Sequence, residues 1–181
     1  INKSVEEHII IQNCLKNDRV SQSKLYNLYH KVMMGVCLRY CKEVFMAEEA
    51  LQNGFIKMFL SLNSYDQSRP FAPWFRRIII NSCLDQLAKN KVSIQIEEEH
   101  FEDRDYIEYP ETDLSYQEVM KIVQNMPDGY RTVFNMYIID DMSHQEIAQS
   151  LRINEATSRS QLFKARNYIR TTLINQKKIT L

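Results

Sequence analysis

The segment that decides the fold lies near the end of the chain, at residues 143–173, and reads SHQEIAQSLRINEATSRSQLFKARNYIRTTL. Ser143 and Glu146 have the spacing of a capping box, in which a serine hydroxyl and a glutamate carboxylate bond to the first amides of a helix. After a three-residue turn, Asn154 is a good N-cap for a second helix. The expected inner face of this helix is Leu162, Ala165, Ile169 and Leu173. Two helices joined by so short a turn predict a helix-turn-helix.

The second helix of this motif carries a polar and basic face. At about 100° per residue, several side chains are expected opposite or beside the apolar stripe. These residues are Thr157, Arg159, Ser160, Phe163 and Lys164. They offer hydrogen-bonding groups, a ring for base contacts and cations for phosphates, which duplex DNA binding requires. The alternative is an ordinary amphipathic helix whose solvated face is basic.

Helical periodicity extends through most of the chain and predicts an all-α fold. Stripes at 25–36, 51–62 and 75–83, with a short helix near 9–15, make one helical domain. The first stripe is expected to bury Leu25, Leu28, Tyr29, Val32 and Val36. Helical periodicity resumes at Val119, in a second domain of four helices that ends with the helix-turn-helix. Because the chain has only 3 Gly and 4 Pro, folds with many tight turns are disfavoured.

Charge is unevenly distributed along a chain whose formal net charge is zero. Residues 1–95 carry a net charge of +5, residues 96–118 one of −9, and residues 119–181 one of +4. The acidic middle is too charged to bury, so we expect a flexible linker there. It is either a solvated spacer or a nucleic-acid mimic in a basic channel of a partner. The predicted organisation is 1–93, first helical domain; 94–115, acidic linker; 116–181, second helical domain.

Several protein classes are disfavoured by what the sequence lacks. No apolar run of about 18 residues occurs, which argues against a membrane span. The start has no secretory signal pattern, so we expect a cytoplasmic protein, trimmed of a few residues because it lacks an initiator Met. There is no glycine-rich phosphate loop and no nucleophile beside a base. We therefore predict no enzyme activity, no catalytic residues, no cofactor and no small-molecule substrate.

The four cysteines do not form a paired C-x-x-C pattern. Cys37 and Cys41 lie one helical turn apart, and His30 lies two turns upstream, so a metal site is conceivable. Structural zinc sites favour two closely spaced ligand pairs, which are missing here. We therefore expect reduced, partly buried thiols and no metal.

Two features of the first domain are candidates for binding. The segment 64–71 is a polar loop interleaved with aromatic residues and is followed by Trp74, Arg76 and Arg77. Aromatic and cationic groups together suit unpaired nucleotides, although Phe71 and Trp74 can equally be core residues. A polar helix face at residues 48–53 suits either a protein interface or plain solvation.

The order of these parts resembles the extracytoplasmic-function (ECF, group 4) bacterial RNA polymerase sigma factors, over nearly the whole chain. The first stretch similar to the family, its region two, is Ala47-Glu48-Glu49-Ala50-Leu51-Gln52-Asn53-Gly54-Phe55, then Phe71-x-x-Trp74 and Asn81-x-x-x-Asp85. The second, its region four, is Met126-Pro127-x-x-x-Arg131-x-Val133-Phe134, Ser143-x-x-Glu146-Ile147-Ala148 and Thr157-Ser158-Arg159-Ser160-Gln161-Leu162-x-x-Ala165-Arg166. Together and in this order, the two stretches are highly specific.

The resemblance implies a dissociable subunit that directs core RNA polymerase to promoter DNA and starts transcription. The residues it implies for the β′ clamp helices of core polymerase are Glu49, Gln52 and Asn53. Those for a flipped base of the −10 element and the non-template strand are Tyr65, Asp66, Gln67, Ser68, Phe71, Arg77 and Asn81. Those for the −35 element are Thr157, at a phosphate, with Arg159, Ser160, Phe163 and Lys164.

Further partners are implied by the resemblance alone. The second domain would touch the β flap, the linker would thread toward the RNA exit channel, and an anti-sigma factor, often membrane-anchored, would bind the two domains. Two departures stand out: Asn53-Gly54 replaces the usual acid and Thr, and Arg152 and Ala156 replace glycines. The alternatives are a stand-alone helix-turn-helix regulator, which would bind duplex DNA without polymerase, and an anti-sigma-type antagonist without DNA contact.

Overall fold

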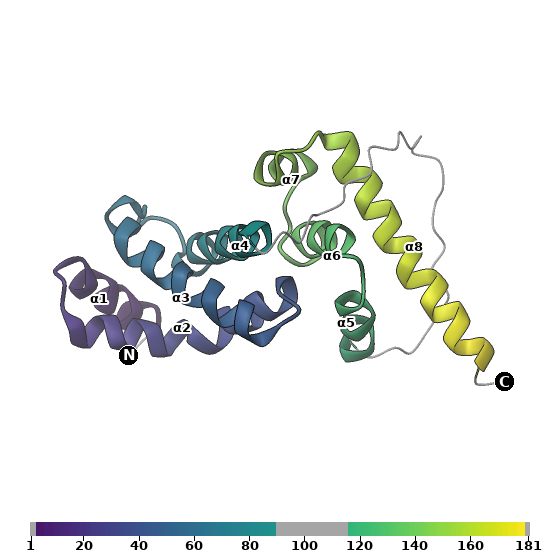
Figure 1. Ribbon diagram of the computed structural model, residues 1–181. Coiled ribbons are helices and arrows are strands. Elements are labelled where there is room, and N and C mark those ends of the chain that lie inside the picture. Colours follow the sequence, from purple (N-terminus) through teal and green to yellow (C-terminus); the bar gives the residue numbers. More distant parts are fainter. Residues whose placement is uncertain (1–2, 90–115, 180–181) are drawn as a thin grey trace. The chain divides into compact units, whose positions relative to one another are not determined.

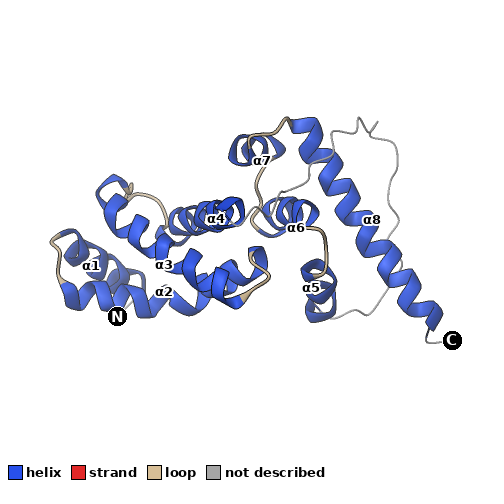
Figure 2. Cartoon of the chain, in the orientation of Figure 1, coloured by secondary structure: helices blue, strands red, loops and turns tan. Residues whose placement is uncertain are grey.

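The computed structural model of the chain describes residues 3–89 and 116–179, and every regular element within them is a helix (Figures 1 and 2). These residues belong to two compact units. The first contains α1 (Lys3–Leu15), α2 (Arg19–Tyr40), α3 (Val44–Ser61), the 3₁₀ turn η1 (Leu62–Ser64) and α4 (Phe71–Lys89). The second contains α5 (Tyr116–Gln124), α6 (Asp128–Phe134), the π-helical turn η2 (Asn135–Ile139), α7 (His144–Leu151) and α8 (Glu155–Ile179). The predicted all-α fold is confirmed, while the acidic linker predicted at 94–115 lies outside the described residues.

The first unit is a bundle in which α2, α3 and α4 pack on one another and α1 packs on α2. Asp18 caps α2, because its carboxylate accepts a hydrogen bond from the Ser21 amide at 2.9 Å. The buried stripe of α2 differs from the predicted one, since Leu28 is 40% and Val32 56% exposed. The α2 side chains that are buried are Ser21, Leu25, Tyr29, Met33, Val36, Cys37 and Tyr40.

Helices α3 and α4 approach each other closely at a glycine. Gly54 of α3 is buried, and a Cβ built on it would overlap the side chain of Ile79 on α4. Ile79 is itself fully buried, so the core offers it little room to move. Gly54, one of the two departures from the family pattern, therefore has a packing role in this chain.

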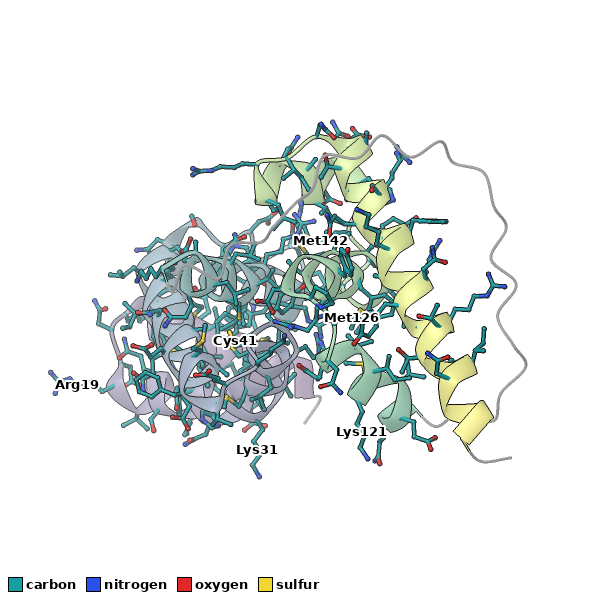
Figure 3. All side chains as sticks on the ribbon, turned by 45° about the vertical axis from the view of Figure 1, so that its right-hand side comes forward. Arg19, Lys31, Cys41, Lys121, Met126 and Met142 are labelled. Carbon is teal, nitrogen blue, oxygen red and sulfur yellow. The ribbon has the colours of Figure 1, made fainter. Side chains whose placement is uncertain are left out.

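Three cysteine side chains meet in the core of the first unit. Cys37 and Cys41 come from α2 and Cys83 from α4, and all three are fully buried. Interaction with the Cys37 and Cys41 thiols, together with burial, raises the pKa of the Cys83 thiol. Figure 3 shows Cys41 among the helices of this unit, with Arg19 and Lys31 directed outward. All four cysteines are buried, more deeply than the partly buried thiols that the sequence predicted.

The second unit consists of α5, α6 and α7 packed against the long helix α8. Its core contains a buried cation, since Arg131 is fully buried and lies 2.7 Å from the Asp128 carboxylate. The same guanidinium donates a hydrogen bond to the Met126 carbonyl at 3.2 Å. Arg131 therefore connects Asp128, at the start of α6, with Met126, which precedes this helix.

The helix-turn-helix forms as predicted. Ser143 and Glu146 make a reciprocal capping box at the start of α7. Asn154 caps α8, because its side-chain oxygen accepts a hydrogen bond from the Thr157 amide at 2.6 Å. Between the helices, Arg152 adopts the left-handed conformation with φ 57° and ψ 44°, where the family more often has glycine. An L-residue in this region is strained by about 1–2 kcal/mol relative to its ordinary conformations.

Candidate nucleic-acid interface

The N-terminal turns of α8 place the predicted DNA-reading residues at different depths. Arg159 is the most accessible, with 55% of its side chain exposed, and it pairs with Glu155 one turn earlier at 3.2 Å. Phe163 and Lys164 follow it along the helix and are half-buried. A cation at the start of the second helix of a helix-turn-helix is placed to reach DNA, because N-terminal residues of that helix contact base edges.

Thr157 and Ser160 lie deeper than the helical wheel predicts. Thr157 is 5% and Ser160 3% exposed, and their neighbours Ser158 and Gln161 are also buried. Burial therefore extends around this part of α8 and is not confined to the Leu162 stripe. A wheel drawn from one apolar stripe misses such burial, because small polar side chains fit wherever other segments approach the helix.

The start of α7 is fixed to α8 by a polar contact. Nδ1 of His144 lies 2.8 Å from the Ser158 hydroxyl, and the His144 ring stacks on Tyr137 at a centroid distance of 4.5 Å. Sequence reasoning assigned no role to His144. The contact orients the two helices of the motif relative to each other, which a recognition helix needs.

The segment between η1 and α4, residues 65–70, is organised around Asp66. Its carboxylate accepts hydrogen bonds from the Ser68 amide at 3.0 Å and the Ser68 hydroxyl at 2.7 Å. It also lies 3.3 Å from Arg69 Nε, and the Tyr65 hydroxyl donates to the Arg69 carbonyl. The Ser68 bonds, and then Arg69, lower the pKa of Asp66. The loop is thus pre-shaped while most of its side chains remain exposed.

Aromatic side chains pack together at the two ends of this loop. The rings of Tyr65, Phe71 and Trp74 lie within 5.0–5.5 Å of one another, and Phe71 also contacts Tyr29 at 5.3 Å. Phe71 is only 4% exposed, so its ring has little surface for stacking on a nucleotide. Further along α4, Arg77 and Asn81 are exposed one helical turn apart.

The polar face predicted on α3 lies beside an apolar surface that the sequence analysis did not single out. Gln52 and Asn53 are exposed, whereas half-buried Glu49 accepts a hydrogen bond from Gln86 of α4. One and two turns beyond Gln52, Ile56 is 57% and Leu60 79% exposed. The signal was present in the sequence, since α3 carries apolar residues on more than one face.

Helix α1 also reaches the 65–70 loop. Gln12 donates a hydrogen bond to the side-chain oxygen of Gln67, and Glu7 accepts one from Tyr29. A groove of about 590 Å³ runs between α1 and the loop. Its lining includes Val5, His8 and Ile9 from α1 and Gln67, Ser68 and Arg69 from the loop. No local sequence pattern predicts the contact between Gln12 and Gln67, because the two residues are 55 positions apart.

Within residues 3–89 and 116–179, no group of three His, Cys, Asp or Glu side chains is arranged to hold a metal ion. In the same parts of the chain, no helix combines the length and the apolar character needed to cross a lipid bilayer.

Comparison with known families assigns both units. Residues 25–92 match the family described as Sigma-70 region 2, and residues 116–169 match Sigma-70, region 4. The two matches together span about two thirds of the chain. The architecture is therefore that of a sigma factor, a non-enzymatic subunit that directs RNA polymerase to promoters through regions 2 and 4.

Similar proteins of known function indicate which class of sigma factor this chain is. The chain is 26% identical over 176 residues to the ECF RNA polymerase sigma factor SigW of Bacillus subtilis, covering 90% of this chain and 94% of the relative. It is 25% identical over 150 residues to SigM of the same organism, covering 81% of this chain and 91% of SigM. The chain belongs to the ECF family of RNA polymerase sigma factors. This resolves the choice left open by the sequence in favour of a sigma factor over a stand-alone regulator.

A solved structure shares the fold. It is the sigma factor RpoE in complex with the anti-sigma factor NepR from Bartonella quintana, at a TM-score of 0.54 and 17% identity. The match covers 83% of this chain and 95% of that one.

Proposed function

We propose that the second unit reads the −35 element through the start of α8. The exposed guanidinium of Arg159 supports this role most directly, and half-buried Phe163 and Lys164 are next to it. Thr157 contributes through its position in the first turn of α8, where a helix N-terminus favours a phosphate, and Ser160 follows about one turn further on. Their burial makes Arg159 the principal reader among the five candidates.

The first unit reads the −10 element with the 65–70 loop. The observation that supports this best is the internal bonding of the loop by Asp66, because a loop that is ordered beforehand loses less entropy when it binds. Tyr65, Gln67 and Ser68 are the candidates for direct contact, and buried Phe71 supports the loop. Arg77 and Asn81 extend the surface along α4 for the displaced strand.

The exposed face of α3 binds the β′ clamp helices of core polymerase. Gln52 and Asn53 are exposed beside the apolar side chains of Ile56 and Leu60, and such a mixture is typical of protein interfaces. Glu49 contributes less directly, since its carboxylate is bound by Gln86.

An anti-sigma factor binds the chain and controls its access to core RNA polymerase. The chain acts in the cytoplasm, where the polymerase is. Support comes from the RpoE–NepR complex, in which a chain of this fold is held by such a partner. A contact with the β flap and the membrane attachment of the partner are the finer parts of this proposal and rest on family resemblance.

The −35 assignment is tested by transcription from a responsive promoter with an intact or a scrambled upstream element. Arg159→Ala should remove most of the advantage that the intact element gives, and should have no effect once that element is scrambled. Arg170→Ala is a matched control, because exposed Arg170 lies on the same helix face about 16 Å further along α8. Equal losses for both variants would contradict the assignment.

A further inference from the structure

The side-chain amide of Gln67 hydrogen-bonds to a residue from outside the region-2 match. Gln12 of α1 precedes residues 25–92, and its Nε2 donates to the Oε1 atom of Gln67. A glutamine amide has an acceptor at one end and two donors at the other. Because Gln12 uses the acceptor end, the donor end of Gln67 remains for a ligand within the described part of the loop.

Helix α1 is itself anchored to the base of the loop, so Gln12 is not an independent surface side chain. Glu7 accepts a hydrogen bond from the Tyr29 hydroxyl, and the Tyr29 ring packs on Phe71 at 5.3 Å. Tyr29 and Phe71 are both buried. The two contacts lie at Glu7 and Gln12, more than one helical turn apart, and together they fix α1 against the loop.

The groove beside this contact is large enough for a nucleotide, and its lining combines apolar and cationic side chains with the Glu7 carboxylate, which Tyr29 binds. Its volume of about 590 Å³ is within the range of small-ligand sites, roughly 300–1,000 Å³. Ile9 and Pro70 offer apolar walls for a base, and Arg69 offers a cation for the backbone. Gln67 lines the groove and Gln12 does not, so Gln12 would act on a bound base only through Gln67.

We propose that Gln12 is a positioning residue for base readout: by holding the carbonyl end of the Gln67 amide, it presents the donor end to an unstacked base of the −10 element. This inference rests on the proposed role of the 65–70 loop. Where the donor faces the C6 substituent of a purine or the C4 substituent of a pyrimidine, it favours an acceptor there, namely the O6 of guanine or the O4 of thymine. Adenine and cytosine present an amino donor there and are disfavoured.

The most specific test is a substitution that turns the Gln67 amide around. A carboxylate at position 12 only accepts hydrogen bonds, so Gln12→Glu should bind the NH₂ end of Gln67 and turn its oxygen toward the base. Holoenzyme would be assembled from core polymerase and the full chain, and transcripts counted from a promoter library randomised across the −10 element. At one position, the wild-type chain should prefer guanine or thymine over adenine or cytosine by roughly three- to tenfold, as expected for one hydrogen bond.

Each variant has a distinct expected profile at that position. Gln12→Ala should flatten the preference, and Gln12→Glu should shift it toward adenine or cytosine. Gln67→Ala should abolish it, and Gln12→Glu should have no further effect in the Gln67→Ala background. Gln22→Glu on α2 is the matched control, since it adds the same charge to the same unit, and it should leave the profile unchanged.

Three results would overturn parts of this account, and they are distinguishable. If Gln67→Ala changes the base preference but neither Gln12 variant does, Gln12 is not a positioning residue, although the loop still reads the −10 element. If Gln67→Ala leaves every −10 preference intact, the proposed role of Gln67 in reading the −10 element is wrong, and the role of Gln12 is wrong with it. A uniform loss of transcription by both Gln12 variants, without a change in base preference, would show a merely structural role and also overturn the inference.

Discussion

Gly54 of α3 packs so closely against Ile79 of α4 that a Cβ on Gly54 would overlap the Cδ1 atom of Ile79. Glycine within a helix costs roughly 1 kcal/mol relative to alanine, so its presence here calls for a compensating contact. The close approach of α3 and α4 provides one. The departure of Asn53-Gly54 from the family pattern therefore includes a packing adjustment in this chain's own core.

Gly54→Ala is expected to destabilise the first unit by about 1 kcal/mol, because overpacking costs roughly 1–3 kcal/mol and improved helix propensity returns about 1 kcal/mol. Ile79→Val removes the overlapping methyl group and should cost about 1 kcal/mol alone. The double variant should lose less free energy of unfolding than the sum of the losses in the two single variants. Denaturant unfolding followed by the fluorescence of Trp74, the chain's one tryptophan, measures this. Strictly additive free energies would show that the two positions do not interact.

Arg152→Gly is expected to stabilise the helix-turn-helix by about 1 kcal/mol, because glycine adopts the left-handed conformation of this turn without the clash that arginine suffers. Hydrogen exchange at the Ile153 amide, which bonds to the Ala148 carbonyl at 3.0 Å, should slow by about fivefold. Gln149→Gly, at an exposed position inside α7, is the control and should accelerate exchange. Faster exchange in Arg152→Gly would mean that the arginine side chain supports the turn.

Leu60→Asp is expected to weaken binding to core polymerase by roughly tenfold or more, because a charge would replace the most exposed apolar side chain of α3 at the proposed interface. Asn53→Ala should cost less, since a rim polar group contributes little. Val20→Asp places the same charge on α2, where Val20 is 63% exposed, and should leave core affinity unchanged. Equal affinities for Leu60→Asp and the wild-type chain would exclude this end of α3 from the interface.

The order of the 65–70 loop should be insensitive to pH between about 5 and 8. The pKa of Asp66 is lowered in the folded chain, so the stabilisation from its charged form is fully present above the unfolded value of about 3.9. It is lost only as the pH falls through the lower folded value. An NMR titration of the Asp66 carboxyl should therefore give a midpoint below about 3.9. Ser68→Ala should raise that midpoint, and an unchanged midpoint would contradict the assigned hydrogen bonds.

Local signals in the sequence were sufficient for the caps and the turn. Ser143 and Glu146 satisfy amides within their own first turn, and Asn154 does the same for α8, so neighbouring residues determine these features. The left-handed conformation of Arg152 occurs at a turn position where the resemblance implied glycine.

Features that depend on packing between distant segments were harder to predict. On α2, a helical repeat allowed two apolar stripes, and the neighbouring helices bury the one with Met33 and Cys37 while Leu28 and Val32 remain exposed. The Gln12–Gln67 contact joins residues 55 positions apart, and no spacing rule reveals it. Burial of Thr157 and Ser160 similarly depends on the surroundings of α8, which a helical wheel omits.

The most direct test of the central claim is reconstitution of core RNA polymerase with this chain, followed by mapping of transcript starts over a promoter library at fixed salt. The account predicts a stable complex with core and initiation from a discrete class of promoters that share elements near −10 and −35. Arg159→Glu should lose the dependence on the −35 element while core binding is retained. Absence of core binding, together with tight duplex binding by the chain alone, would contradict the account.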